Sequence, residues 1–375
     1  MRINSIEFHD KARNWRLEKT TFDDFTLLVG ASGVGKTQIL RAITAIKQIA
    51  FSRNYASSRF ISSVDWKINF NVSQTEQYIW SGSFNEDAEI HSEELILNGR
   101  EILRRTAEEI IFQDEKTPKF PRRASILTVI EEEPLIAPIP TGFRKIIYSQ
   151  YAEKMLRGLA FRYSEYEEIS SVTTIDEILE GYMDTELKML SGYKNQHPKF
   201  TKIKDIFTSI FPQIEDVKIE IEDDNSKRIR PRSLMVRDKP ILQLKEKKID
   251  TWIPEQSISS GMLRTFWHLC EIFLAPEGSV ILIDEFENSL GVNCIGALTD
   301  EILNSERNLQ FIITSHHPYI INNVDMQYWK IVTRNGGVVK THTAEELKLG
   351  KSKHRAFTEL TNNIEFRTGK EEELV

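Results

Sequence analysis

The chain has 375 residues, 40% hydrophobic residues and a formal net charge of −7, which leaves room for one large domain or two ordinary ones. The negative charge argues against a protein that coats nucleic acid nonspecifically, although a local basic patch remains compatible with it. No apolar run approaches the length that crosses a bilayer, and we expect no secretion signal. The two cysteines, Cys270 and Cys294, lack a metal-binding spacing, so a reduced, cytoplasmic setting is expected.

Residues 1–29 are predicted to be β-structure that ends in the apolar run Phe25–Val29. Residues 30–37 then match G-x-x-x-x-G-K-[ST], the pattern of a phosphate-binding loop. An apolar-periodic stretch after the loop predicts a helix that ends at about Ala50. A chance match to the pattern is expected in roughly one percent of chains this long, and the flanking strand and helix lower that frequency further.

The chemistry of this loop explains its residue types. Gly30, Gly33 and Gly35 allow backbone conformations that a β-carbon forbids. Successive N–H groups can then cradle phosphate oxygens, together with the N-terminus of the helix. Lys36 would reach the β- and γ-phosphates, and the Thr37 hydroxyl would help to hold Mg²⁺. The predicted phosphate-binding residues are Gly30, Ala31, Ser32, Gly33, Val34, Gly35, Lys36 and Thr37.

The middle of the chain changes from a strand pattern to a helix pattern. Alternating apolar residues over 65–115, interrupted by Asn98-Gly99, predict an antiparallel β-meander. The segment 125–130 fits a short helix or a short strand. Helical spacing then dominates from Tyr148 to about Tyr193.

A further amphipathic helix is predicted to end before Pro212, and alternation over 217–222 predicts a strand. The basic stretch 227–237 could contact the phosphate backbone of a nucleic acid. A solvated loop is the more common interpretation of such a charge block, and we prefer it here.

Near-continuous apolar residues over 279–283 predict a buried parallel strand that ends in Asp284 and Glu285. Carboxylates at this end of a strand lie near the ligand crevice of an open α/β sheet. Asp284 is therefore placed to hold Mg²⁺, and Glu285 to polarise an attacking water molecule. The alternative is that the two carboxylates only cap the following segment.

Two more stretches carry candidate site residues. A third buried strand, Leu309–Ile313, precedes His316, which could donate a hydrogen bond to a γ-phosphate or orient the water molecule. The alternative is a loop histidine without such a role. Ser259, Ser260 and Gly261 precede an apolar helical run, so their N–H groups could bind an anion at a helix start. The alternative is an N-cap serine followed by a core helix.

Taken in order, these stretches resemble the ABC-type ATPases of the SMC, RecF and OLD-nuclease group. Residues 30–37 correspond to the Walker A motif, 259–262 to the signature, 281–285 to Walker B, and His316 to the switch histidine. Residues 28–30 and 314–318 look most like the stand-alone AAA-type ATPases of bacterial anti-phage defence operons, such as the Septu, PARIS and OLD-like ATPases.

The sequence departs from the pattern of these families in three places. The signature lacks the second glycine and the glutamine of the transporter form. Phe286 stands where relatives usually have proline, and Gly291 follows Leu290 where they have His-Pro. The glutamine of the Q-loop has no clear counterpart, and Gln113 is the candidate for it.

The resemblance implies an α/β fold, a P-loop ABC-type ATPase head with an antiparallel β subdomain and a helical insertion. We expect an N-terminal ATPase lobe over 1–145, a helical insertion over 146–215 that forms a lid or docks a partner, and a C-terminal ATPase lobe over 216–375. The resemblance further implies ATP and Mg²⁺ as cofactors, hydrolysis of ATP to ADP and phosphate, and a homodimer or higher homo-oligomer with ATP between the subunits.

The function that the resemblance implies is that of a nucleotide-gated sensor, regulator or scaffold for a separate effector. A nuclease from a neighbouring gene is the expected effector, in anti-phage defence or DNA metabolism. DNA is an open partner, and no membrane partner is expected. Three alternatives remain: a transporter ATPase subunit, a P-loop kinase or GTPase switch, and a nucleotide-bound scaffold that hydrolyses slowly or not at all.

Overall fold

The structure is a computed structural model that describes residues 1–51, 63–85, 89–149, 173–181, 183–221, 240–349 and 358–360. The chain forms two compact units, which are described separately. The first comprises residues 1–148, 278–286 and 307–375, and the second comprises 149–277 and 287–306. The sequence predicts a division of the chain into two ATPase lobes and a helical insertion, with boundaries at residues 145 and 215. This division stays a prediction. The basic stretch 227–237 lies outside the described residues, as do residues 150–172 of the helical pattern.

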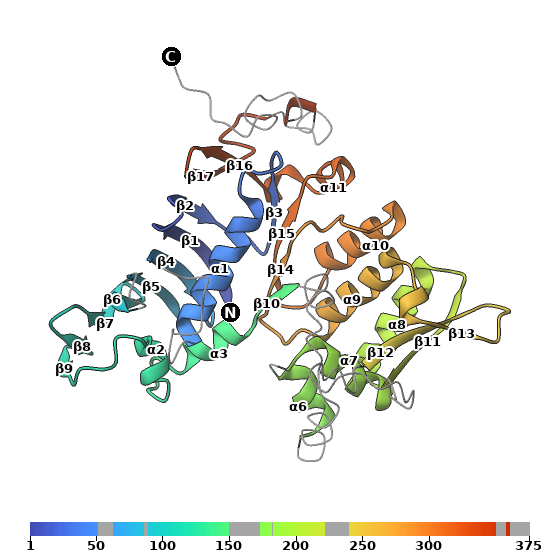
Figure 1. The fold of residues 1–375 in the computed structure, drawn as a ribbon, viewed down its shortest axis with the longest axis horizontal. Coiled ribbons are helices and arrows are strands. Elements are labelled where there is room, and N and C mark those ends of the chain that lie inside the picture. The colour runs from blue at the N-terminus through green and yellow to red at the C-terminus, as the bar shows by residue number, and fades with distance from the viewer. Residues whose placement is uncertain are drawn as a thin grey trace, which may run out of the picture. The chain divides into compact units, whose positions relative to one another are not determined.

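One large sheet forms the frame of the first unit (Figure 1). Within the described residues it has 14 strands, in the order β10-β14-β15-β3-β16-β17-β2-β1-β4-β5-β6-β7-β8-β9. The strands are β1 (Arg2–Asp10), β2 (Trp15–Thr21), β3 (Phe25–Val29), β4 (Val64–Asn71), β5 (Gln77–Phe84), β6 (Ile90–Leu97), β7 (Arg100–Arg105), β8 (Ile110–Phe112), β9 (Glu115–Thr117), β10 (Ile146–Ser149), β14 (Val280–Ile283), β15 (Gln310–Ser315), β16 (Trp329–Asn335) and β17 (Val338–Thr343).

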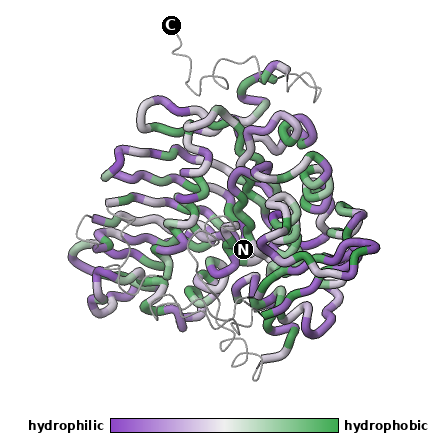
Figure 2. The backbone as a smooth tube through the Cα atoms, turned by 45° about the vertical axis from the view of Figure 1, so that its right-hand side comes forward, coloured by the Kyte–Doolittle hydropathy of each residue, from purple (hydrophilic) through white to green (hydrophobic). Residues whose placement is uncertain are grey.

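Strand direction divides this sheet into two parts. β14, β15, β3 and β16 pair in parallel, whereas β4 to β9 form an antiparallel meander that β1 joins to the rest of the sheet. Every residue of β3 and β14 is buried, as expected for parallel strands that are covered on both faces. β4 buries alternate residues, and hydrophobic and hydrophilic segments alternate along the meander strands in Figure 2. The expected α/β fold with an antiparallel β subdomain is confirmed.

Local sequence signals explain two of the element boundaries in this unit. Asn98 and Gly99 have φ angles of 49° and 83° and form the turn between β6 and β7, as the Asn-Gly pair predicts. Residues 125–130, which fitted a helix or a strand, contain the helix α2 (Ile126–Val129). The Ser125 side chain accepts a hydrogen bond from the N–H of Leu127 and so caps that helix.

The helix α1 (Lys36–Phe51) is fixed by a buried stripe that includes Ile39, Ile43 and Ile46. These side chains belong to one core cluster with residues of the sheet, of α2 and of α3 (Pro138–Arg144). The first residues of α1 are thereby held where β3 ends. Among the described residues, no helix has the length and apolar character that would let it span a membrane.

The second unit is built from helices and a small sheet of β11, β12 and β13. Its elements are α6 (Ile175–Glu180), α7 (Thr185–Lys194), α8 (Pro198–Ile210), β11 (Ile214–Ile221), β12 (Pro240–Glu246), β13 (Trp252–Pro254), α9 (Ser260–Leu274) and α10 (Val292–Leu303). The predicted helix before Pro212 and the predicted strand over 217–222 are thus confirmed as α8 and β11.

The helix α9 lies in the core of the second unit. The ring of Phe266 packs against Phe200 and Phe207, with centroid distances of 6.3 and 5.4 Å. At the other end of the helix, the buried Lys188 donates to the carbonyl oxygens of Leu179 and Leu274, at 2.7 and 3.0 Å. These carbonyls end α6 and α9, where a cation complements the helix dipole. These contacts fix the position of α9 in the second unit, and with it the position of the residues at its start.

Candidate functional site

The predicted phosphate-binding loop lies at the carboxyl end of β3. β3 runs parallel between β15 and β16, with Ile313 paired to Leu27 and Ile331 paired to Val29. The carboxyl ends of these strands therefore meet at one edge of the sheet, which is where open α/β sheets bind their ligands. The loop connects this edge to the N-terminus of α1.

The backbone of the loop needs the glycines that the sequence supplies. Gly30, Gly33 and Gly35 have φ angles of 154°, 84° and 114°, which residues with a β-carbon rarely adopt. A β-carbon on Gly30 would also lie 2.7 Å from the carbonyl oxygen of Val332. The predicted need for glycine at these positions is confirmed.

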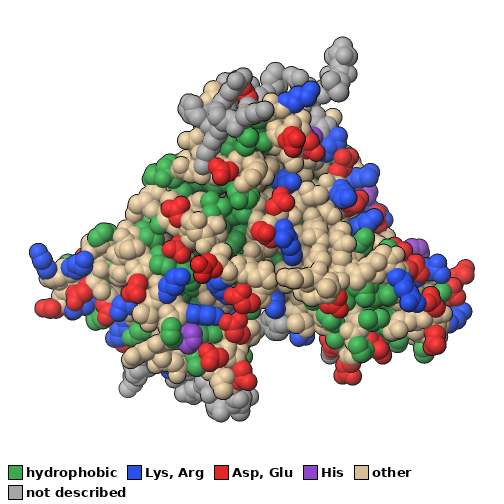
Figure 3. All heavy atoms as spheres, turned by 180° about the vertical axis from the view of Figure 1, so that it is seen from behind, with side chains coloured by type: hydrophobic (Ala, Val, Ile, Leu, Met, Phe, Trp, Pro, Cys, Tyr) green, Lys and Arg blue, Asp and Glu red, His purple; other side chains and the backbone are tan. Residues whose placement is uncertain are grey.

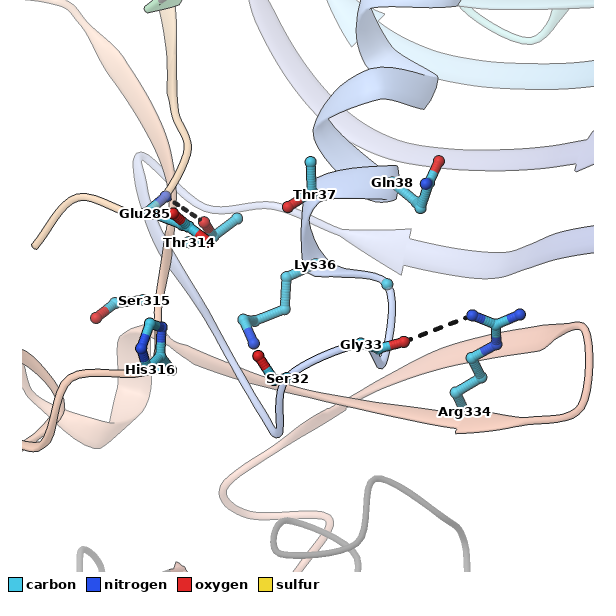
Figure 4. A pocket seen from close by; sticks show the side chains of 11 residues that line it. Ser32, Gly33, Lys36, Thr37, Gln38, Glu285, Thr314, Ser315, His316 and Arg334 are labelled. Atoms are coloured by element: carbon cyan, nitrogen blue, oxygen red, sulfur yellow. Dashed lines mark hydrogen bonds between the residues drawn. The ribbon is translucent and has the colours of Figure 1, made fainter. Parts of the chain in front are cut away.

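Lys36 folds back over the loop that precedes it. Its Nζ donates to the carbonyl oxygens of Gly30 and Ala31, at 2.7 and 2.9 Å. In Figure 4 the side chain points from the start of α1 toward Ser32. The ammonium charge is thus held at the centre of the loop, where a phosphate oxygen would approach it.

Asp284 connects three separate elements of the site. Its Oδ1 accepts hydrogen bonds from Thr37 Oγ1 at 3.0 Å and from Thr314 Oγ1 at 2.7 Å. The strands β14 and β15 pair Ile283 with Ile313, which brings Asp284 level with Thr314. The structure therefore brings the predicted metal-binding residues Thr37 and Asp284 together.

Glu285 has a strained backbone conformation. Its φ angle is 46°, in the left-handed region, which costs a residue other than glycine about 1–3 kcal/mol and is typical of functional sites. The N–H of Glu285 donates to Thr314 Oγ1 at 2.8 Å, and the N–H of Phe286 donates to the carbonyl oxygen of Thr314 at 3.1 Å. Thr314 thus holds the backbone that carries both acidic residues.

A pocket gathers seven of the fifteen predicted site residues (Figure 4). It is lined by Ser32, Gly33, Gly35, Lys36, Thr37, Gln38, Glu285, Thr314, Ser315, His316 and Arg334. Sequence reasoning had not selected Gln38, Thr314, Ser315 or Arg334. Thr314 and Ser315 end a buried strand, but the pairing that places Thr314 beside Asp284 is not evident from the sequence, and nothing in the sequence indicated Arg334.

The two adjacent histidines have different surroundings. His316 lines the pocket. His317 is the N-cap of the helix α11 (Pro318–Asn323), because its Nδ1 accepts a hydrogen bond from the N–H of Tyr319 at 3.2 Å. The geometry therefore favours His316 for contact with a ligand and assigns His317 to the local structure.

This difference makes the pair a matched test. We expect His316→Ala to slow nucleotide turnover by about 100-fold or more, as removal of a group that orients the reacting atoms does. We expect His317→Asn to leave turnover within about twofold, since asparagine is a good N-cap residue. Steady-state kinetics of both variants checks the assignment, and equal losses would contradict it.

The predicted Q-loop residue is not part of this pocket. Gln113 lies in the turn between β8 and β9, with a φ angle of 51°, at the opposite end of the sheet from β14. The structure therefore does not bring Gln113 to the pocket, and we withdraw it as the Q-loop candidate. Its choice rested on residue type alone.

The signature segment belongs to the second unit. Ser259 is the N-cap of α9, and its hydroxyl accepts a hydrogen bond from the N–H of Met262 at 3.3 Å. Ser260 and Gly261 begin the helix, as predicted, and a β-carbon on Gly261 would lie 2.7 Å from the carbonyl oxygen of Ser289. Their role in binding an anion stays a prediction.

The oxygen ligands beside the phosphate-binding loop suit Mg²⁺. Among the described residues, no group of three or more His, Cys, Asp or Glu side chains could enclose a metal ion. Mg²⁺ usually keeps several water molecules and is bound through one or two carboxylates together with the phosphates of a substrate. The Thr37 hydroxyl and the Asp284 carboxylate provide such a partial set of ligands.

Comparisons with known proteins identify the family and the fold of the chain. The sequence model of a family described as "AAA domain, putative AbiEii toxin, Type IV TA system" matches residues 25–322. A crystal structure of an SMC head bound to the C-winged helix domain of ScpA superimposes with a TM-score of 0.54 and 15% identity, over 92% of this chain and 97% of that chain. At this identity the likeness shows the fold alone.

Two further SMC heads are less similar. One, with an extended coiled coil and bound to the C-terminal domain of ScpA from Pyrococcus furiosus, has a TM-score of 0.49 and 14% identity, over 92% of this chain and 97% of that chain. The other, from Thermotoga maritima, has a TM-score of 0.42 and 14% identity, over 92% of this chain and 99% of that chain. A comparison with curated proteins gives no match.

Proposed function

The chain belongs to the AbiEii-type AAA family and has the fold of an SMC-type ATPase head, and on this premise we propose that it binds ATP with Mg²⁺ and hydrolyses it. The observation that carries the proposal is that Thr37 and Thr314 both donate hydrogen bonds to Oδ1 of Asp284, beside the phosphate-binding loop. Thr37 and Asp284 are 247 residues apart in the sequence. A strand-end carboxylate that only capped its own segment would not need this contact.

The predicted site residues of the first unit have separate chemical roles in this proposal. The backbone N–H groups of residues 30–37 and the ammonium of Lys36 bind the phosphates. Thr37 and Asp284 hold Mg²⁺, which when bound neutralises charge that develops on the phosphate oxygens. Glu285 orients the attacking water molecule and accepts its proton, and His316 donates a hydrogen bond toward the γ-phosphate.

We further propose that ATP controls the association of two copies of the chain. The signature segment 259–261 of one copy would then contact the triphosphate bound by the other, and hydrolysis would release the pair. Such a ligand shifts the equilibrium only through its different affinity for the two states. The proposed role of this switch is to regulate a separate effector in anti-phage defence or DNA metabolism, with the helical region 146–215 as the docking surface.

DNA is a weaker element of the proposal. On the face seen in Figure 3, acidic and basic side chains are interspersed. A face of this kind does not create the positive field that attracts nucleic acid.

Sedimentation of the Glu285→Gln variant tests the proposed association. With Mg-ATP the variant should form dimers, because it binds ATP and turns it over slowly, whereas with ADP it should remain monomeric. Adding Ser260→Arg should abolish the dimer, since it places a bulky charge at the start of α9. Ser209→Arg provides the control, because Ser209 is an exposed residue of α8 in the same unit. A mass that is the same with ATP and ADP would contradict the proposed association.

A further inference from the structure

The hairpin of β16 and β17 forms a wall beside the phosphate-binding loop. A β-carbon on Gly30 would lie 2.7 Å from the carbonyl oxygen of Val332 in β16. A β-carbon on Gly35 would lie 3.1 Å from Cγ2 of Val339 in β17. Both ends of the loop therefore rest on this hairpin, and side chains near the turn of the hairpin have a fixed position relative to the loop.

The turn of the hairpin is itself fixed. The N–H of Arg16 donates to the carbonyl oxygen of Gly337 at 2.8 Å. A β-carbon on Gly337 would lie 2.0 Å from the carbonyl oxygen of Asn14, so only glycine fits this close approach of two turns. Gly336 has a φ angle of 56°, which also favours glycine. The turn of the hairpin is thus held in place by its contacts with the turn that connects β1 to β2.

Arg334 is a half-buried residue near this turn and lines the pocket. Its Nε donates to the carbonyl oxygen of Gly336 at 2.7 Å, and its Nη1 lies 3.5 Å from the carbonyl oxygen of Gly33. A guanidinium has more N–H donors than these two contacts use. Within the described part of the chain, no carboxylate forms an ion pair with Arg334. A positive charge with spare donors is therefore held at the pocket by backbone contacts.

The position of Arg334 indicates which part of a nucleotide it would contact. Lys36, Glu285 and His316 define the end of the pocket where the γ-phosphate would lie. In Figure 4 Arg334 lies on the other side of the Gly33 turn from these three side chains. Away from the γ-phosphate, a nucleotide carries negative charge on its β- and α-phosphates, and the α-phosphate is the farther of the two from that end.

We infer that Arg334 binds the α-phosphate of a nucleoside diphosphate or triphosphate in this pocket. The inference rests on the proposed nucleotide binding and adds a contact that the motifs do not predict. A guanidinium can donate two parallel, charge-assisted hydrogen bonds to the oxygen atoms of one phosphate. Because ADP and ATP share the α-phosphate, Arg334 strengthens the binding of both nucleotides equally.

Equilibrium titrations of Arg334→Gln with ADP, ATP and UDP test this assignment. We expect the dissociation constants of ADP and ATP to rise by the same factor, about 10-fold to 100-fold, which is the effect of losing a hydrogen bond to a charged group. UDP should lose the same factor, since it has the same phosphates and a different base. Arg334→Lys should restore part of the affinity, because it keeps the charge and loses the fork.

Three results would overturn the assignment. A loss for ATP alone would place the guanidinium on the γ-phosphate, and a loss for ADP without a loss for UDP would place it on the base. Unchanged affinity for all three nucleotides would remove Arg334 from the site. Arg16→Gln is the matched control, because it removes an exposed arginine of β2, next to the same turn, that does not line the pocket. If the wild-type chain and this control bind no nucleotide, the proposed function itself fails, which is a different outcome.

Discussion

Replacing Glu285 by glutamine should slow ATP turnover by about 100-fold to 10,000-fold while ATP still binds. Glutamine keeps the size of the side chain and the N–H that donates to Thr314 Oγ1. It removes the carboxylate that would accept a proton from the attacking water molecule. The turnover rate and the dissociation constant of ATP, measured on the same preparation, separate the two effects.

The control for this variant is Glu306→Gln, which makes the same change at an exposed position outside the pocket. It should retain wild-type turnover. Normal turnover by Glu285→Gln would exclude Glu285 as the general base. A loss of ATP affinity that accounts for the whole loss of turnover would instead assign Glu285 to binding.

Replacing Arg105 by methionine should lower the free energy of unfolding by about 3–5 kcal/mol, the typical effect of leaving a buried charge without its partner. Arg105 Nη1 lies 3.6 Å from Glu93 Oε2, and their side chains are 2% and 0% exposed. Arg105 also donates to the carbonyl oxygens of Ala124 and Pro121, each at 2.9 Å. The variant leaves these acceptors and the Glu93 carboxylate without the guanidinium. Urea unfolding of wild type and variant measures the difference.

A neighbouring arginine provides the control for this substitution. Arg104→Met is the control, because the neighbouring Arg104 side chain is 50% exposed and its ion pair with Glu101, at 3.5 Å, should contribute at most about 1 kcal/mol. Equal effects of the two substitutions would contradict the account.

The destabilisation by Arg105→Met should also depend on pH. Burial raises the pKa of Glu93 above its ordinary value. When the pH is lowered toward that pKa, the folded chain binds a proton that the unfolded chain does not bind. Stability therefore rises as the pH falls through this range. The charge of Arg105 lowers the pKa of Glu93, so the substitution raises that pKa further in the variant. The variant then gains more stability than the wild type as the pH falls, and the effect of the substitution should shrink. A destabilisation that grows as the pH falls would contradict this assignment.

The Glu93 cluster also connects the meander to the helix that carries the phosphate-binding residues. Glu93 accepts hydrogen bonds from Ser125 Oγ at 2.6 Å and from the N–H of Ile126 at 3.0 Å, at the start of α2. From α2, Thr128 Oγ1 donates to the carbonyl oxygen of Ala50 at 2.7 Å, near the end of α1. The cluster thus fixes α2 between the meander and α1.

Sequence alone could predict those parts of the fold whose signals are local. The strand, glycine turn and helix around Lys36 follow from residues that are adjacent in the chain, and so does the hairpin at Asn98-Gly99. Asp284 and His316 could be selected because each follows a strand that contains a run of apolar residues. In each of these cases the residue type and the position in the element carry the information.

The missed residues depend on contacts between distant segments. Thr314 is important because β14 and β15 pair in a register that brings it level with Asp284, and a single sequence does not contain that register. Arg334 reaches the pocket because β16 lies beside β3. Gln113 was selected by its residue type alone, without a strand or helix pattern that would place it near the phosphate-binding loop, and the structure places it away from the pocket.

The most direct test of the account is equilibrium binding of Mg-ATP to the wild-type chain and to Lys36→Ala. Lys36 is held at the centre of the loop by the carbonyl oxygens of Gly30 and Ala31, and its ammonium should supply a charge-assisted contact worth about 1.5–3 kcal/mol. The account predicts saturable binding by the wild-type chain and an affinity at least about 10-fold lower for Lys36→Ala. No binding by the folded wild-type chain, or equal binding by both chains, would contradict it.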